Sequence, residues 1–299
     1  MTARILLFSA IAALGFASAG PARAKELVLE PSSAWNIDYA ADSCALRRTF
    51  GDGPQKTTLE MRRFAPDNVM QTTVATAASR MGSGTFSYRL DPDKKNRSPG
   101  FWHHLIFDQG QQGVIFGMAF EDAPMKGLHA EDFIKHAQLL ASQDFLDREA
   151  KAADEVSSIT LAGAFSTILV LKTGSLKAPL MAMRDCIEEL RRHWGVDLGV
   201  QAKLARPAVP VNRASVDRMM DYPPKMLAKG MPGIVNVRLA IDERGNVTNC
   251  FIQMPLADPA FEKSTCADLQ HALDFEPALD QNGKPVASYW VTMVDFRVD

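Results

Sequence analysis

The sequence predicts an α+β fold in two parts: an N-terminal antiparallel β-rich domain with helices, and a small C-terminal domain with the order strand, strand, helix, strand. In the first part, short runs of aromatic and β-branched residues alternate with turn-forming residues, which is typical of strands. In the second part, a hairpin pattern precedes a helical one. The 299 residues, 46% hydrophobic and 23% charged, have the composition of a globular protein with one large or two modest domains.

Residues 1–24 have the layout of a secretory signal peptide. Arg4 precedes an apolar stretch of about 16 residues, and the small-residue triplet Ala22-Arg23-Ala24 follows it. We therefore expect cleavage before Lys25 and export to the periplasm, with no stable membrane span afterwards. The alternative is an uncleaved inner-membrane anchor, although the stretch is shorter than the roughly 20 residues that span a bilayer.

The next segment, residues 25–198, is expected to form the β-rich domain. Helical spacing of apolar residues predicts helices over 130–142 and 175–194, and residues 156–171 are expected to add a further pair of strands. Residues 199–221 lose this periodicity and are interpreted as a linker. The seven strands expected in the first half of the domain are Trp35–Tyr39, Cys44–Phe50, Thr58–Phe64, Val69–Ala75, Thr85–Leu90, Phe101–Phe107 and Gly113–Phe120.

Four cysteines are expected to form disulfides, because an exported chain meets an oxidising compartment. Cys44, Cys186, Cys250 and Cys266 allow three pairings. Cys250 and Cys266 are 16 residues apart within the C-terminal domain, and the other two lie upstream. We therefore favour Cys44 with Cys186 and Cys250 with Cys266. Neither pair has the CxxC spacing of a redox or zinc site.

The charge balance argues against nucleic acid as a partner. The chain has 33 Lys and Arg residues against 35 Asp and Glu residues, a formal net charge of −2. Such a chain has no long-range attraction to a phosphate backbone.

The C-terminal domain, residues 222–299, gives the clearest pattern. Residues 233–242 alternate in polarity, a short turn follows, and residues 247–254 form the returning strand of a hairpin. Asp258 and Pro259 have the residue types of a helix N-cap and first helical position, so a helix is expected from there to about Leu273. A last strand is expected over 288–298.

This domain resembles the TonB C-terminal domain over residues 222–299, about a quarter of the chain. The resemblance implies a periplasmic module that takes an extended segment of an outer-membrane transporter as an added strand, in the service of transmembrane transport. The matching residues are Tyr222-Pro223, Gly233-Ile234-Val235, Ile241-Asp242, Gly245-Asn246-Val247, Phe275-x-Pro277-Ala278 and Asn282-Gly283-Lys284-Pro285-Val286.

The last strand is the candidate partner-binding site. A three-stranded sheet has an edge whose unpaired N–H and C=O groups can bind a peptide in extended conformation. The alternative is that dimerisation, or the upstream domain, caps this edge. The residues expected on the edge strand are Ser288, Trp290, Thr292, Val294, Phe296 and Val298.

Two departures from the TonB pattern argue against force transmission. A transducer needs a membrane anchor and a long proline-rich tether, whereas this chain is expected to lose its apolar segment and has a folded domain upstream. The leading hypothesis is therefore a binding component of envelope transport. The alternative is an envelope structural or interaction protein with no role in energy coupling. In this alternative, the protein could form a homodimer.

The sequence predicts no enzyme, cofactor or metal site. His129 and His136 are seven residues apart on one helical face, and the adjacent His103 and His104 point to opposite sides of a strand. Neither HExxH nor GxSxG occurs. An enzyme with its site in the upstream domain is the remaining alternative, and it would need one of these histidines to act in catalysis.

Overall fold

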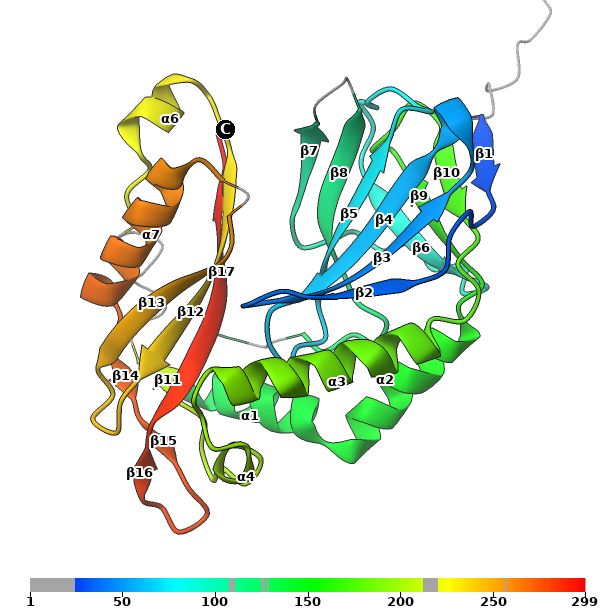
Figure 1. Ribbon diagram of the computed structural model, residues 1–299. Helices are drawn as coiled ribbons and strands as arrows, with labels where there is room; N and C mark the ends of the chain where they lie inside the picture. Colours follow the sequence, from blue (N-terminus) through cyan, green and yellow to red (C-terminus); the bar gives the residue numbers. More distant parts are fainter. Residues whose placement is uncertain are drawn as a thin grey trace, which may run out of the picture.

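The computed structural model describes residues 25–298 except 108–110, 125–126, 128, 212–219 and 256. The expected signal peptide, residues 1–24, lies outside the described residues. The fold is mixed α+β, as the sequence predicts, with antiparallel sheets and helices in the N-terminal part and a strand and helix region at the C-terminus (Figure 1).

The larger sheet of the upstream region, residues 25–198, has six antiparallel strands in the order β2-β3-β4-β5-β8-β7. All six correspond to runs that the sequence predicts, with boundaries that differ by one or two residues at most ends. The strands are β2 (Asn36–Tyr39), β3 (Cys44–Phe50), β4 (Thr57–Arg63), β5 (Met70–Thr76), β7 (Trp102–Ile106) and β8 (Gln112–Met118). A short 3-10 helix, η1 (Gly53–Gln55), joins β3 to β4.

A second sheet has four strands in the order β1-β10-β9-β6. This sheet contains the strand predicted over Thr85–Leu90 and the pair of strands predicted within 156–171. The four are β1 (Glu26–Leu29), β6 (Ser87–Asp91), β9 (Ser158–Ala162) and β10 (Ile168–Leu171). β1, which pairs in parallel with β10, was not predicted from the sequence. Four residues give too short a pattern, and the partner strand is far along the chain.

Three helices belong to the upstream region: α1 (Ala130–Ala141), α2 (Gln143–Glu155) and α3 (Lys177–His193). The helix α2, which begins directly after α1, was not predicted from the sequence. Ser142 separates the two helices, and its hydroxyl accepts a hydrogen bond from the Phe145 N–H as the N-cap of α2. The helix α3 runs beneath β2 and β3 (Figure 1), and its buried Leu180, Met183 and Ile187 join the two sheets in one hydrophobic core.

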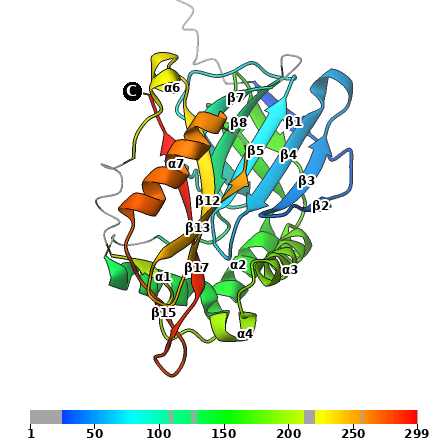
Figure 2. The same ribbon diagram turned by 60° about the vertical axis from the view of Figure 1, so that its left-hand side comes forward.

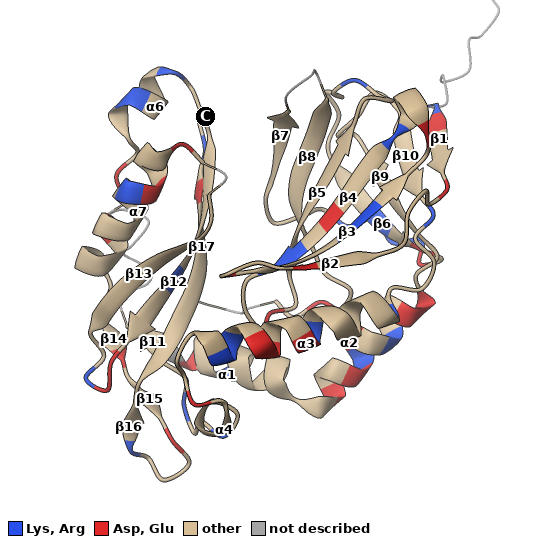
Figure 3. Ribbon diagram, in the orientation of Figure 1, with Lys and Arg blue, Asp and Glu red and all other residues tan. Residues whose placement is uncertain are grey.

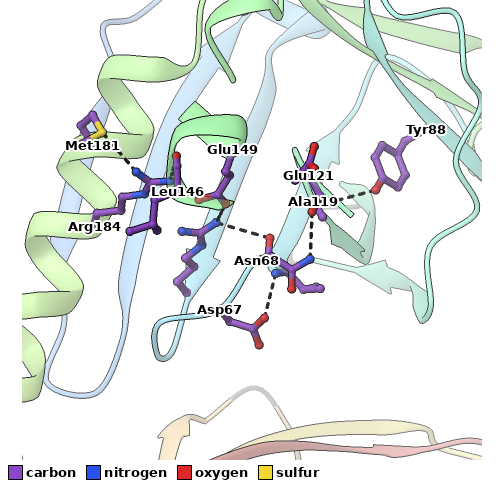
Figure 4. A network of polar contacts seen from close by, with 11 residues as sticks. Asp67, Asn68, Tyr88, Ala119, Glu121, Leu146, Glu149, Met181 and Arg184 are labelled. Carbon is purple, nitrogen blue, oxygen red and sulfur yellow. Dashed lines mark hydrogen bonds and ion pairs between the residues drawn. The ribbon is translucent and has the colours of Figure 1, made fainter. Parts of the chain in front are cut away.

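A buried ionic network fixes α2 and α3 to the larger sheet (Figure 4). Glu149 of α2 accepts hydrogen bonds from Arg63 of β4 and from Arg184 of α3, the latter at 2.6 Å. Arg184 also donates to the Leu146 carbonyl oxygen, and Arg63 to that of Asn68. One carboxylate thus links three elements, and its removal would leave two guanidinium groups without their counterion.

The C-terminal region contains a three-stranded antiparallel sheet in the order β13-β12-β17, with α7 across one face (Figure 2). The hairpin, helix and strand all lie where the sequence predicts them. The main elements are β12 (Gly233–Ile241), β13 (Val247–Met254), α7 (Pro259–Ala272) and β17 (Ser288–Phe296). The smaller ones are α6 (Pro224–Ala228), β14 (Phe275–Glu276), β15 (Ala278–Leu279) and β16 (Pro285–Val286).

The described part of the segment interpreted as a linker packs against the C-terminal region. It contains most of α4 (Leu198–Gln201) and the short strand β11 (Val209–Pro210), which pairs with β14. Val209 is fully buried, and Arg206 forms an ion pair with Glu276. Residues up to 211 are therefore held by the C-terminal region rather than extended between two bodies.

Candidate functional site

The hairpin that begins the C-terminal sheet is built by a tight turn. The Asp242 carboxylate accepts hydrogen bonds from the N–H groups of Arg244 and Asn246. Gly245 has φ +86°, and a Cβ at this position would lie 2.1 Å from the Phe275 carbonyl oxygen. Only glycine fits such a backbone at such a close approach. The turn therefore fixes the register of β13 against β12.

The helix α7 covers the face of the sheet that the sequence predicts to be apolar. Asp258 caps the helix by accepting a hydrogen bond from the Ala260 N–H, and Pro259 takes the first helical position. Phe261 and Leu269 are buried against the apolar side chains of β12, which are Val235, Val237, Leu239 and Ile241. This packing places β17 with one face toward α7 and the other toward the upstream region.

Both predicted disulfides are confirmed. Cys44 of β3 is bonded to Cys186 of α3, and Cys250 of β13 to Cys266 of α7. Each bond joins a strand to the helix that packs on it. Two such bonds fit an oxidising, extracytoplasmic location.

The predicted edge strand is at the border of the sheet. β17 pairs with β12 over nine residues, from Gly233 with Phe296 to Ile241 with Ser288, without a register shift. Among the described residues, no further strand pairs with the outer side of β17. Its outer N–H and C=O groups are therefore available as a template for another extended backbone.

The side chains predicted for this site have different surroundings. Trp290, Val294 and Phe296 pack into the core beneath α7, and alternation places Thr292 on the same face. Ser288 is buried and bonds to Gln201 of α4 at 2.8 Å, while Val298 lies beyond the strand and is 43% exposed. β17 therefore offers its backbone to a partner, because most of its side chains are committed to the fold.

The opposite face of the sheet packs on the upstream region, a contact that sequence reasoning missed. Ile234 of β12 lies against Phe101 and Ile115, and Met293 of β17 packs against the same cluster. Polar contacts surround it: Asn236 Nδ2 donates to Gln71 Oε1 at 2.9 Å, and Gln253 donates to the carbonyl oxygens of Asp42 and Phe64. The only sequence signal was the apolar character of Ile234, which does not identify its partner.

Arg238 lies in an aromatic cage at this contact. Its guanidinium carbon is 4.6 Å from the ring centre of Trp194 and 4.0 Å from that of Phe251. The side chain is nearly buried and pairs with Asp42 at 3.1 Å. Trp194 also packs edge to face on Tyr289 of β17. The cation thus joins β12 and β13 to the upstream region.

A second ionic contact joins β7 to β17. His103 Nε2 lies 2.6 Å from Asp295 Oδ1, and Arg297 pairs with the other carboxylate oxygen at 2.7 Å. Burial alone would raise the pKa of Asp295, but the hydrogen bonds from His103 and Arg297 outweigh it and hold the pKa below its ordinary value. Asp295 is therefore a stabilising carboxylate in its ionised form.

The strands of the C-terminal sheet carry little charge (Figure 3). Arg238 and Asp295 are the only charged residues of β12, β13 and β17, and both point at the upstream region. Charged side chains commonly protect sheet edges from pairing. The outer border of β17 lacks this protection.

The histidines do not converge. His103 contacts Asp295, whereas His104 lies against Met81 on the other side of β7, and His129 precedes α1. Within the described ranges, no group of three or more His, Cys, Asp or Glu residues could hold a metal ion. No helix in the same ranges has the length and apolar character needed to cross a bilayer.

The C-terminal sheet is small and covered by one helix, and among the described residues no strand pairs with the outer side of its border strand, β17. Residues 218–298 match the family described as Gram-negative bacterial TonB protein C-terminal. This part of the molecule is a TonB C-terminal domain. Among curated proteins, no sequence matches the chain.

Proposed function

We propose that this chain is an exported periplasmic protein that binds an extended segment of an envelope protein by strand addition to β17, in the service of transmembrane transport. The observation that carries the proposal is the outer edge of β17, nine residues long and unpaired among the described residues. An outer-membrane transporter is the partner that the TonB C-terminal domain suggests.

The choice of β17 over the other border of the sheet rests on regularity. β13 also has an outer side with no strand partner in the described part of the chain, but its pairing with β12 has two register shifts. Bulges of this kind twist a strand and discourage edge pairing. β17 has none, so it presents the longer regular template.

The same proposal assigns a role to each segment of the chain. Residues 1–24 act as a signal peptide, residues 25–198 fold as one domain, 199–221 connect, and 222–299 bind the partner. Separate hydrophobic cores in the two regions support this division. The upstream domain covers one face of the C-terminal sheet, and none of its described strands pairs with the border of β17.

The test is hydrogen exchange of the disulfide-bonded protein, residues 25–299, with and without peptides from the plug regions of outer-membrane transporters. We expect slower exchange of amides in 288–296 on binding and unchanged exchange in 247–254, which serves as the internal control. Protection of β13 alone, or binding by none of the peptides, would contradict the proposal.

A matched pair of peptides separates strand addition from side-chain binding. Each is N-methylated at alternate residues, in one of the two possible registers. Only alternate amides of an added strand bond to the edge, so one register should abolish binding and the other should leave it nearly intact. Equal affinity of both would exclude pairing along β17.

A second candidate is an envelope interaction protein with no role in energy coupling. It is favoured by the extensive contact of the C-terminal sheet with a folded domain, where a transducer would have a tether. In that case sedimentation velocity should reveal a dimer through β17, formed equally well with or without peptide.

A further inference from the structure

A cleft of about 570 Å³ lies where the C-terminal region meets the upstream region, at the end of β17. Pro99, Phe101 and Trp102 line it from the start of β7, and Pro232, Arg297 and Val298 line it from the C-terminal region. It is therefore formed jointly by two parts of the chain that are far apart in the sequence.

The cleft lies where β17 ends and β12 begins. Arg297 and Val298 directly follow Phe296, the last residue of the strand, and both line the cleft. A backbone added along the outer side of β17 and extended past Phe296 would run beside Arg297 and Val298, two residues that line the cleft. The side chains of its last residues would then contact the upstream region.

The lining combines proline and aromatic residues with two polar side chains, those of His103 and Arg297. Met231, next to the lining residue Pro232, is 41% exposed, and Val298 is 43% exposed. The Arg297 side chain is 57% exposed, and it donates hydrogen bonds to Asp295 and to the Gly100 carbonyl oxygen. Proline and aromatic walls suit a bulky apolar side chain, and the exposed guanidinium suits a neighbouring carboxylate.

We propose that this cleft is the specificity pocket for the added strand: it takes a bulky apolar residue of the partner peptide, with an acidic residue beside it paired to Arg297. The inference rests on strand addition to β17, which supplies the position of the peptide. The upstream region would thus select the partner, while the edge of β17 supplies affinity that depends little on sequence.

Gly100 provides a clean way to fill the cleft. It lines the cleft, its φ is not positive, and a Cβ there would meet no atom within 4 Å. Gly100→Phe should therefore occupy the space without straining the backbone, and Gly100→Ala is the matched control. Equal melting temperatures of both variants and the wild type would verify the fold.

The measurement is fluorescence anisotropy with two labelled peptides that differ only at the end near the cleft. One ends in Leu-Glu and the other in Ala-Gln. Wild type should prefer Leu-Glu about tenfold or more, as expected for a bulky side chain entering an apolar pocket. Gly100→Phe should remove the preference, and Gly100→Ala should keep it.

Arg297 is tested separately. Arg297→Gln should weaken binding of the acidic peptide about threefold, the size of an exposed ion pair, and leave binding of the Ala-Gln peptide unchanged. Arg297→Lys should restore most of the difference, which a purely structural role through Asp295 would not predict.

The outcomes distinguish this inference from the function on which it rests. If neither peptide binds wild type, strand addition itself is wrong. If both bind equally well, and Gly100→Phe changes nothing, β17 accepts strands but the cleft selects none of them, and the inference is overturned.

Discussion

Arg238 joins the C-terminal sheet to the upstream region. A buried cation is tolerated when it is paired and surrounded by polarisable groups. Arg238 has both, because Asp42 supplies the counterion and the rings of Trp194 and Phe251 cover its guanidinium. Each partner comes from a different segment of the chain, so the Arg238 side chain holds these segments together.

Replacing this side chain should destabilise the protein. We expect Arg238→Ala to lower the free energy of unfolding by about 2 kcal/mol, through lost cation–π contacts and an unpaired Asp42. Arg238→Lys keeps the charge but not the planar stack, so it should lose less. Urea unfolding followed by tryptophan fluorescence measures both, and an unchanged midpoint for Arg238→Ala would contradict this account.

At the scale of elements, each disulfide joins a strand to its covering helix. The bond between Cys250 and Cys266 holds β13 to α7 over a separation of 16 residues, and that between Cys44 and Cys186 holds β3 to α3 over 142. In the chain-entropy view, a longer closed loop stabilises more because it restricts the unfolded chain more. Neither bond involves β17.

The two disulfides should therefore stabilise the fold by different amounts, and neither should be needed for peptide binding. Replacing Cys250 and Cys266 with serine should cost about 3 kcal/mol, and replacing Cys44 and Cys186 about 5 kcal/mol. Calorimetry of the two double variants checks the order. Peptide affinity of the folded protein should stay the same in the Cys250 and Cys266 variant, and a large loss there would show that β17 depends on this bond.

At the scale of the whole molecule, the C-terminal sheet lies between α7 on one side and the upstream region on the other (Figure 1). The contact between the regions combines a small apolar cluster with polar pairs, including that of His103 with Asp295. Contacts of this mixed kind respond to conditions that change charge. Because Asp295 stabilises the contact in its ionised form, low pH is the condition expected to weaken it.

Acid should loosen this contact. The folded-state pKa of Asp295 is lower than its ordinary value, so its stabilising contribution is complete above about pH 4 and is lost as the pH falls through the lower folded value. Other carboxylates titrate in the same range, so the measured quantity is the difference between wild type and Asp295→Asn in urea unfolding from pH 2 to 6. That difference should shrink toward low pH, and a constant difference would contradict the assignment.

Local chemistry was enough to predict most elements of the fold. The turn at Asp242 and Gly245, the cap at Asp258 and Pro259, and the alternation of β12 are short-range patterns, and each appears at its predicted place. The missed elements lack such patterns. β1 is four residues long and needs β10 as its partner, and α2 follows α1 with only Ser142 between them.

The sequence alone determined the α+β class, the TonB C-terminal domain and the position of the border strand, because each depends on side-chain periodicity or turn chemistry within a short stretch. It also determined the cysteine pairing, because Cys250 and Cys266 lie close together in one domain and leave Cys44 for Cys186. Only the tertiary structure decided that the second face of the C-terminal sheet rests on the upstream region. It also placed Arg238 between Trp194 and Phe251, and opened a cleft where β7 meets the end of β17. Most of these contacts join residues far apart in the sequence, and they depend on shape and charge at surfaces that no local pattern encodes.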